Sequence, residues 1–159
     1  MKALVIYDSV FGNTEQVAQA MGEALSAQTE LTTSRVTDIS PEQLTEVEYL
    51  IVGSPTRGFQ PTPDTKKLLK SLPTSGLQGV KVAAFDTRVS VEDANSFVFG
   101  VLVKFFGYGA KPIANLLKKA GGELVVPPEG FLVEGTEGPL KDGELERAAD
   151  WARQILETP

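Results

Sequence analysis

The chain of 159 residues contains no cysteine and no histidine. The absence of cysteine excludes disulfides, thiol catalysis and iron–sulfur clusters held by this chain. Zinc sites almost always use Cys or His, and hydrolytic triads usually need His, so we expect neither. Any redox chemistry in this protein therefore requires a bound organic cofactor.

Long hydrophobic runs are also missing. The longest apolar stretch, "FVFGVLVKFFGYG", is interrupted by Gly100, Lys104 and Gly107 and is shorter than the ~20 residues that cross a bilayer. The opening "MKALVIY" lacks the features of a signal peptide, so we expect a cytoplasmic protein with no membrane partner.

Positive charge is scarce, with 15 Lys and Arg against 21 Asp and Glu and a net charge of −6. This balance argues against nucleic acid as a partner and favours partner proteins with basic docking surfaces. The alternative is that the mild acidity only aids solubility.

Apolar runs and helical patterns alternate along the chain. Short continuous apolar runs are typical of strands buried on both faces, and spacings of three and four are typical of helices. Five strands separated by helices predict one α/β domain, residues 1–159, with a parallel sheet covered on both faces. The expected strands are 2–7, 31–36, 48–54, 79–87 and a last one interrupted by Pro127 and Pro128; the expected helices are 14–27, 62–72, 111–122 and 142–157.

Polar and glycine residues follow three of these strands: "DSVFGNT", "GSPTRGFQPTP" and "DTRVS". In open parallel sheets, ligands bind beyond the carboxyl ends of the strands. The three loops are therefore the candidate binding site.

In the first loop, Ser9, Gly12, Asn13 and Thr14 stand between a strand and a helix N-terminus. Unpaired N–H groups of a first helical turn, with hydroxyl donors and a glycine, suit a phosphate monoester. The loop lacks the lysine of a P-loop and the GxGxxG spacing of a dinucleotide site. A loop that only caps the helix, through Ser9 or Asn13, is the alternative.

The stretch Ser9–Glu15, "SVFGNTE", resembles the phosphate loop of the flavodoxin family, Thr/Ser-x-Thr-Gly-x-Thr, often continued as Asn-Thr-Glu. The departure is Phe11, which replaces a hydroxyl residue but keeps its backbone N–H. The resemblance spans the chain. It implies a flavodoxin-like three-layer sandwich with strand order 2-1-3-4-5 and FMN as the cofactor. It places the FMN phosphate on Ser9, Val10, Phe11, Gly12, Asn13 and Thr14.

The resemblance assigns the loops after the third and fourth strands to the flavin ring. Gly58 suits the peptide flip that accompanies flavin reduction in the family, because glycine adopts positive φ readily. Phe59 suits stacking on the ring; an ordinary turn glycine and a core phenylalanine are the alternatives. The expected contacts of the first ring loop are Ser54, Pro55, Thr56, Arg57, Gly58 and Phe59.

The loop after the fourth strand matches the family less well, because no tyrosine follows closely. Asp86 is expected to accept from the flavin N3–H, with Thr87 and Arg88 beside it. Arg57 and Arg88 can attract the anionic reduced flavin or bind an anionic second substrate. Alternatively they point to solvent or pair with nearby carboxylates, Asp86 among them.

Residues 95–109 have no counterpart in minimal flavodoxins. Val98, Leu102, Phe105 and Phe106 at helical spacing predict a helix packed on the domain; a flap beside the flavin or a dimer surface are the alternatives.

The sequence thus predicts an FMN-binding flavodoxin-type protein that carries electrons between partner proteins. An FMN-dependent NAD(P)H oxidoreductase, acting as a quinone or flavin reductase, is the first alternative. A flavin-free interaction domain on the same scaffold is the second. A signalling receiver is disfavoured because the third strand ends in Gly53-Ser54 rather than in a phospho-acceptor aspartate.

Overall fold

The structure is a computed structural model that describes residues 1–94 and 96–159; Asn95 and the side chains of Phe105 and Phe106 lie outside the described residues. Its centre is a parallel sheet in the order β2-β1-β3-β4-β5, with β6 also paired to β4. The order and the parallel pairing are those expected from the sequence. The strands are β1 Lys2–Tyr7, β2 Glu30–Arg35, β3 Tyr49–Pro55, β4 Lys81–Val89, β5 Glu123–Leu124 and β6 Glu129–Val133.

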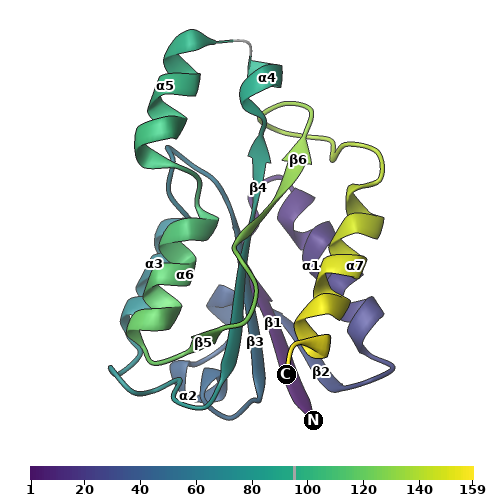
Figure 1. Ribbon diagram of the computed structural model, residues 1–159, viewed down its shortest axis with the longest axis vertical. Coiled ribbons are helices and arrows are strands. Elements are labelled where there is room, and N and C mark those ends of the chain that lie inside the picture. The colour runs from purple at the N-terminus through teal and green to yellow at the C-terminus, as the bar shows by residue number, and fades with distance from the viewer. Residues whose placement is uncertain (95) are drawn as a thin grey trace.

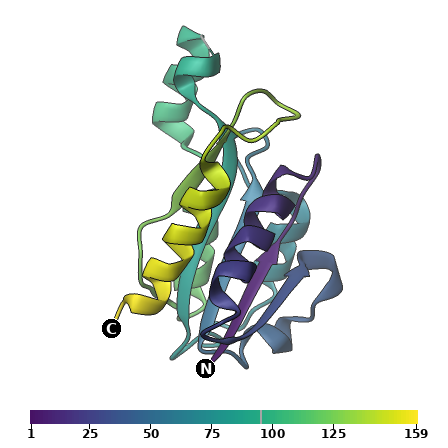
Figure 2. The ribbon, with the colours of Figure 1, turned by 90° about the vertical axis from the view of Figure 1, so that its right-hand side faces the viewer.

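Helices cover both faces of the sheet. Helices α1 (Asn13–Leu25) and α7 (Glu144–Glu157) lie side by side on one face, and α3 (Pro63–Lys70) and α6 (Ala110–Lys119) cover the other (Figures 1 and 2). Every helix and strand expected from the sequence is present, with ends that differ by at most three residues. The pattern did not reveal three short helices: η1 (Val36–Asp38), α2 (Pro41–Leu44) and α4 (Val91–Ala94). No helix in the described part of the chain is long and apolar enough to cross a membrane.

Two hydrophobic cores lie on the two faces of the sheet. Under α1 and α7, the rings of Phe85, Phe131 and Trp151 meet edge to face at centroid distances of 6.0–6.2 Å. Under α3 and α6, Leu69 and Leu117 pack on the opposite faces of the same strands. Residues of β1, β3 and β4 are buried on both sides, which explains why these strands are continuous apolar runs.

The last strand is divided as the prolines predict. Strand β5 pairs with the start of β4 through Lys81 and Val82, and β6 pairs with its end from Phe85 to Val89. Pro127 and Pro128 occupy the gap, because proline has no N–H to offer a sheet ladder. The division carries β6 to the carboxyl end of β4, beside the candidate site.

The helix expected in residues 95–109 forms as α5 (Phe97–Phe106), but none of its described side chains is buried, so it does not pack on the domain as a core helix. Phe97 is 86% exposed and Val98 66% exposed. Helices α4 and α5 project beyond the carboxyl end of the sheet as an extension of the fold (Figure 1). Residues that repeat at helical spacing predicted the helix but could not show that it leaves the core.

Candidate cofactor-binding site

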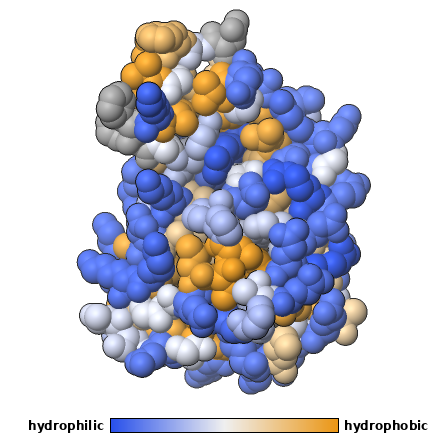
Figure 3. All heavy atoms as spheres, viewed as in Figure 1, coloured by the Kyte–Doolittle hydropathy of each residue, from blue (hydrophilic) through white to orange (hydrophobic). Residues whose placement is uncertain are grey.

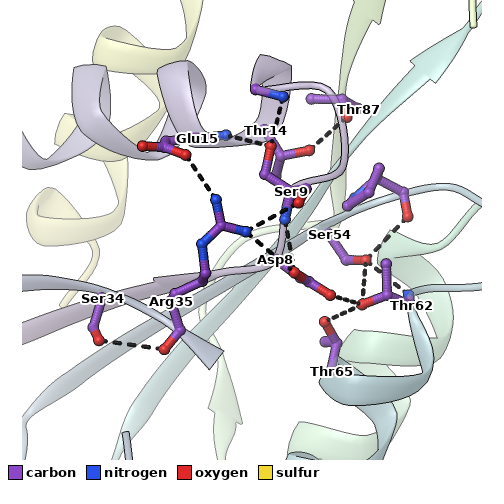
Figure 4. Close-up of polar contacts among 12 residues, drawn as sticks. Asp8, Ser9, Thr14, Glu15, Ser34, Arg35, Ser54, Thr62, Thr65 and Thr87 are labelled. Atoms are coloured by element: carbon purple, nitrogen blue, oxygen red, sulfur yellow. Dashed lines mark hydrogen bonds and ion pairs between the residues drawn. The ribbon is translucent and has the colours of Figure 1, made fainter. Parts of the chain in front are cut away.

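The loop between β1 and α1, residues Ser9–Thr14 and called here the phosphate loop, is folded around one hydroxyl group. The Ser9 Oγ accepts hydrogen bonds from the N–H groups of Gly12 at 3.1 Å and Glu15 at 3.4 Å (Figure 4). Gly12 precedes α1 with a φ of 91°, a left-handed conformation that glycine adopts without strain. Gly12 is the N-cap residue, so neither Ser9 nor Asn13 occupies the N-cap position, although the Ser9 hydroxyl accepts from the Glu15 N–H in the first turn of α1.

Four backbone N–H groups of the phosphate loop, those of Val10, Phe11, Asn13 and Thr14, have no hydrogen-bond partner among the described residues. Unpaired N–H groups that precede a helix form an anion-binding nest with a partial positive charge. This donor set suits a phosphate group.

Arg35, at the end of β2, supports the phosphate loop from behind. One guanidinium nitrogen donates to the Ser9 carbonyl at 3.0 Å, and the other binds the Glu15 carboxylate at 2.9 Å; Asp8 lies 3.5 Å away (Figure 4). Its charge is balanced by these two carboxylates, so the nest itself contains only neutral donors. Sequence reasoning missed Arg35, because its place on the neighbouring strand becomes visible only in the register that sets Tyr7 beside Arg35.

Ser54, at the end of β3, is fully buried and does not reach the cavity described below. Its hydroxyl donates to the Pro55 carbonyl at 3.0 Å and accepts from the Thr62 N–H at 2.9 Å. The Thr62 hydroxyl in turn donates to Asp8 at 2.6 Å (Figure 4). Ser54 therefore holds the following loop in place from beneath.

The first ring loop, residues Pro55–Phe59, ends in a tight reversal. Arg57 and Gln60 exchange two backbone hydrogen bonds of 2.8 and 3.0 Å. Gly58 and Phe59 between them have φ values of 55° and 65°. Two successive positive φ values are those of a type I′ turn, in which a phenylalanine is strained. The Phe59 ring lies 5.7 Å, centroid to centroid, from the ring of Phe99 on α5.

The residues expected to form the second ring loop, Asp86–Val89, are the carboxyl-terminal part of strand β4 in the structure; the name is kept here for this segment, which contains a buried ion pair. The Arg88 guanidinium donates to both carboxylate oxygens of Asp86, at 2.6 and 2.7 Å, and the Ala110 N–H donates to the same carboxylate at 2.9 Å. Burial raises the pKa of Asp86, while Arg88 and the Ala110 N–H oppose the shift. Gly130 on β6 makes room for this pair, because a Cβ there would collide with the guanidinium.

A cavity of about 360 Å³ opens where these loops meet. The phosphate loop and the second ring loop are joined at its edge by a 2.8 Å hydrogen bond between the buried hydroxyls of Thr14 and Thr87. Of the residues expected from the sequence, Gly12, Ser54 and Asp86 are not among its walls. The lining residues are Ser9, Val10, Phe11, Asn13, Thr14, Pro55, Thr56, Arg57, Gly58, Phe59, Thr87, Arg88, Val89, Phe99, Tyr108, Val133 and Thr136.

The family model described as flavodoxin matches residues 5–151, which include all three loops. The chain belongs to the flavodoxin family. FMN is the cofactor of this family, and its members transfer electrons to redox partner proteins.

Solved structures of flavodoxins have the same fold. A flavodoxin from the domain Archaea is 23% identical with a TM-score of 0.75, covering 99% of this chain and 97% of the other. Oxidised flavodoxin 1 from Bacillus cereus is 18% identical with a TM-score of 0.77, covering 100% and 99%. Rubredoxin oxygen:oxidoreductase from Desulfovibrio gigas is 18% identical with a TM-score of 0.72, and the match covers 98% of this chain but 35% of that longer one.

Tyr108 supplies the aromatic side chain that sequence reasoning did not find after the fourth strand of this flavodoxin-family chain. It lines the cavity, its ring lies 3.8 Å from the Arg88 guanidinium carbon, and its hydroxyl donates to the Val89 carbonyl at 3.3 Å. The next N–H, of Gly109, donates to the Thr56 hydroxyl at 2.9 Å. Helices α4 and α5 separate Tyr108 from β4 in the sequence, and only the fold returns it to the site.

The two arginines of the ring loops differ in their surroundings. The charge of Arg88 is balanced by Asp86, as the ion-pair alternative predicted, and the Asp86 carboxylate faces Arg88 and α6 rather than the cavity. Arg57 is exposed at the cavity, with its guanidinium carbon 5.7 Å from the centre of the half-exposed Phe11 ring. Only Arg57 therefore presents a cationic group to the cavity without an acidic partner among the described residues.

Proposed function

We propose that this chain is an electron carrier that binds FMN with its phosphate in the nest of the phosphate loop and its ring in the cavity beside it. The observation that carries the proposal is the set of four unpaired N–H groups, of Val10, Phe11, Asn13 and Thr14, at the edge of a cavity with aromatic walls. FMN, when bound, supplies the redox chemistry; the chain binds, orients and shields it.

The phosphate is held by neutral donors alone, with Ser9 and Arg35 fixing the shape of the loop. The backbone N–H of Phe11 remains available to the phosphate. The Phe11 side chain is half-exposed, and it makes no hydrogen bond to the N–H groups of the loop. Substitution of the family's hydroxyl residue by Phe11 therefore removes one donor without blocking the nest.

The ring is enclosed by apolar and aromatic side chains. Phe59, Phe99 and Tyr108 supply stacking surfaces, and Arg57 adds a positive charge that favours a negatively charged reduced flavin. The Arg88 charge has little such effect, because Asp86 balances it. In this proposal Asp86 positions Arg88 and Tyr108 instead of contacting the flavin N3–H.

The proposal is tested by titrating the apoprotein with FMN and with riboflavin, which has the same ring without the phosphate. We expect FMN to bind at least 100-fold more tightly, because the charged phosphate receives several N–H hydrogen bonds. Equal affinities would contradict the assignment of the nest.

Acidic groups beside the cavity support partners with basic docking surfaces. Glu134 and Glu137 are exposed on the loop after β6, and Glu137 adjoins the cavity residue Thr136. We expect the reduced chain to reduce a basic haem protein faster than an acidic one. This preference should be lost in the variant Glu134→Gln/Glu137→Gln. A cytoplasmic location stays a prediction, to be tested by fractionation of cells.

The exposed Arg57 favours a second candidate function, an FMN-dependent NAD(P)H oxidoreductase. A guanidinium at the cavity can bind a phosphate or carboxylate of a second substrate. Under this alternative NADH or NADPH bleaches the flavin directly in a two-electron step, and Arg57→Gln raises the KM for the nicotinamide. If the chain is a carrier, neither nucleotide reduces it without a partner. A colourless preparation that ignores added FMN would instead favour the flavin-free interaction domain.

A further inference from the structure

Charge is distributed unevenly between the two faces of the sheet. Helices α3 and α6 carry six lysines and one aspartate, a net charge of +5, in a chain whose net charge is −6. Helices α1 and α7 on the opposite face carry six carboxylates and two arginines, a net charge of −4. The lysines of the first pair, called here the lysine face, are Lys66, Lys67, Lys70, Lys111, Lys118 and Lys119.

The charge of the lysine face is directed at solvent. Five of its lysines are exposed and Lys66 is half-buried. None of them takes part in an ion pair within the described residues, whereas on the opposite face Arg147 pairs with Glu144 and Arg153 with Asp150. The positive charge is therefore available to a partner.

An apolar groove of about 390 Å³ runs along α6 within the lysine face. Ala114, Leu124 and Pro128 form apolar walls, and Lys111 and Lys118 stand at its side. In Figure 3, hydrophilic side chains cover the side formed by α3 and α6, and an apolar patch lies beside them. An apolar centre with a charged rim is the composition of a protein-docking site.

The groove adjoins the cofactor cavity. Arg88 and Tyr108 line both, so only these two side chains separate a partner seated in the groove from the proposed position of the flavin ring. Short-lived complexes between redox proteins bury small interfaces, and their association is steered by complementary charge.

On these grounds, and resting on the proposed electron-carrier function, we propose that the lysine face and its groove dock an acidic redox protein. The partner's docking surface carries Asp and Glu carboxylates around an apolar side chain that enters the groove. The carrier then has two docking faces of opposite charge, one for a basic and one for an acidic partner. An extended polyanion is disfavoured, because the carboxylates on the rest of the surface repel it.

The test uses two probes of the same size and opposite charge, cytochrome c, which is basic, and its succinylated form, which is acidic. Each is titrated into the isotopically labelled full chain at low ionic strength, and binding is mapped by NMR. We expect the succinylated form to shift resonances of α3 and α6, and its affinity to fall as salt is added.

The variant Lys67→Gln/Lys118→Gln removes two exposed charges of the lysine face and should weaken binding of the succinylated probe three- to tenfold. The matched control Lys2→Gln/Arg153→Gln removes two exposed charges elsewhere and should leave it within twofold. Equal effects of the two variants, shifts confined to other elements, or tighter binding of duplex DNA or anionic vesicles than of the acidic probe would overturn the proposal.

Binding is read without electron transfer, so this test is independent of the flavin. If the chain fails to bind FMN but the acidic probe maps to the lysine face, the proposed function fails and the docking face stands. If FMN binds and the acidic probe maps elsewhere, the docking proposal alone fails.

Discussion

The phosphate loop and the two ring loops meet at one cavity but are stabilised in different ways. The phosphate loop folds around Ser9 through contacts within seven residues, with Arg35 as an outside support. The second ring loop depends on groups far apart in sequence: Asp86 binds the Ala110 N–H, and Arg88 lies against Tyr108. The contacts of the phosphate loop are local, so this loop could be predicted from the sequence. The contacts of the second ring loop are long-range, so its conformation depends on the whole fold.

The largest difference between the phosphate loop and the second ring loop is expected in how much their arginines, Arg35 and Arg88, contribute to the free energy of unfolding. Arg88→Met leaves the fully buried Asp86 carboxylate without its partner, and we expect the free energy of unfolding to fall by about 3–5 kcal/mol. Arg35→Met removes a half-exposed arginine whose carboxylates keep contact with water, so the loss should be about 1 kcal/mol or less. Chemical denaturation of the two variants measures both values.

The double variant Asp86→Asn/Arg88→Met controls for lost packing. It removes both charges and keeps an oxygen for the Ala110 N–H, so it should recover part of the loss. If Arg88→Met costs no more than Arg35→Met, the buried pair does not anchor the second ring loop.

The next effect concerns the phosphate loop and is seen in binding. Ser9→Ala/Thr14→Ala removes the hydroxyl that shapes the loop and the hydroxyl that joins it to Thr87, and FMN affinity should fall about 100-fold. Riboflavin affinity should stay unchanged, because it has no phosphate. The control Ser26→Ala/Thr29→Ala removes two hydroxyls near the other end of α1. An unchanged FMN affinity in the first variant would place the phosphate elsewhere.

Some features of the fold and of the site could be predicted from the sequence, and others could not. The alternation of strands and helices and the phosphate loop were predictable, because they follow from periodicity and from a motif of adjacent residues; the sheet order was implied by the resemblance to flavodoxins. Tyr108 and Phe99 were not, because Phe99 lies on the inserted helix α5 and Tyr108 shortly after it, and no local pattern says where an inserted helix returns.

The roles of individual polar residues were also beyond the sequence. Ser54 and Asp86 were expected to face the flavin, but the structure uses both internally: Ser54 with Thr62, and Asp86 with Arg88. A polar residue at a strand end can point to either side of the sheet edge, and the partners that decide the direction lie on other elements.

Glu144, at the start of the last helix, α7, connects that helix to strand β6. It accepts from the Leu132 N–H at 2.7 Å and pairs with Arg147, and the loop before it supplies the Glu137 carbonyl that binds the Asn13 side chain. Burial alone would raise the pKa of Glu144, but the hydrogen bonds from Arg147 and Leu132 outweigh it and leave the pKa lowered. The ionised form is thus stabilised by folding.

A carboxyl whose pKa is lowered by folding adds stability above its unfolded pKa, and that stability is lost as the pH falls through the folded pKa. Glu144→Gln should therefore reduce the free energy of unfolding by about 1–2 kcal/mol at pH 7, and the difference from wild type should vanish in acid. Glu146→Gln, an exposed carboxylate in the same helical turn, should have little effect at either pH. A Glu144→Gln effect that persists unchanged in acid would assign the role of Glu144 to shape and not to charge.

The smallest expected effect concerns the residues with positive φ in the phosphate loop and in the first ring loop. The phosphate loop places Gly12 at its positive φ, whereas the first ring loop places Phe59 at a φ of 65°. Replacing Phe59 by Ala and by Gly removes the same ring, but only Gly relieves the strained backbone. Phe59→Gly should be more stable than Phe59→Ala by about 0.5–1 kcal/mol, the reverse of the usual order. If Ala is the more stable, the turn relaxes to a negative φ once the ring is gone, and the Phe59–Phe99 contact is what holds the strained turn in place.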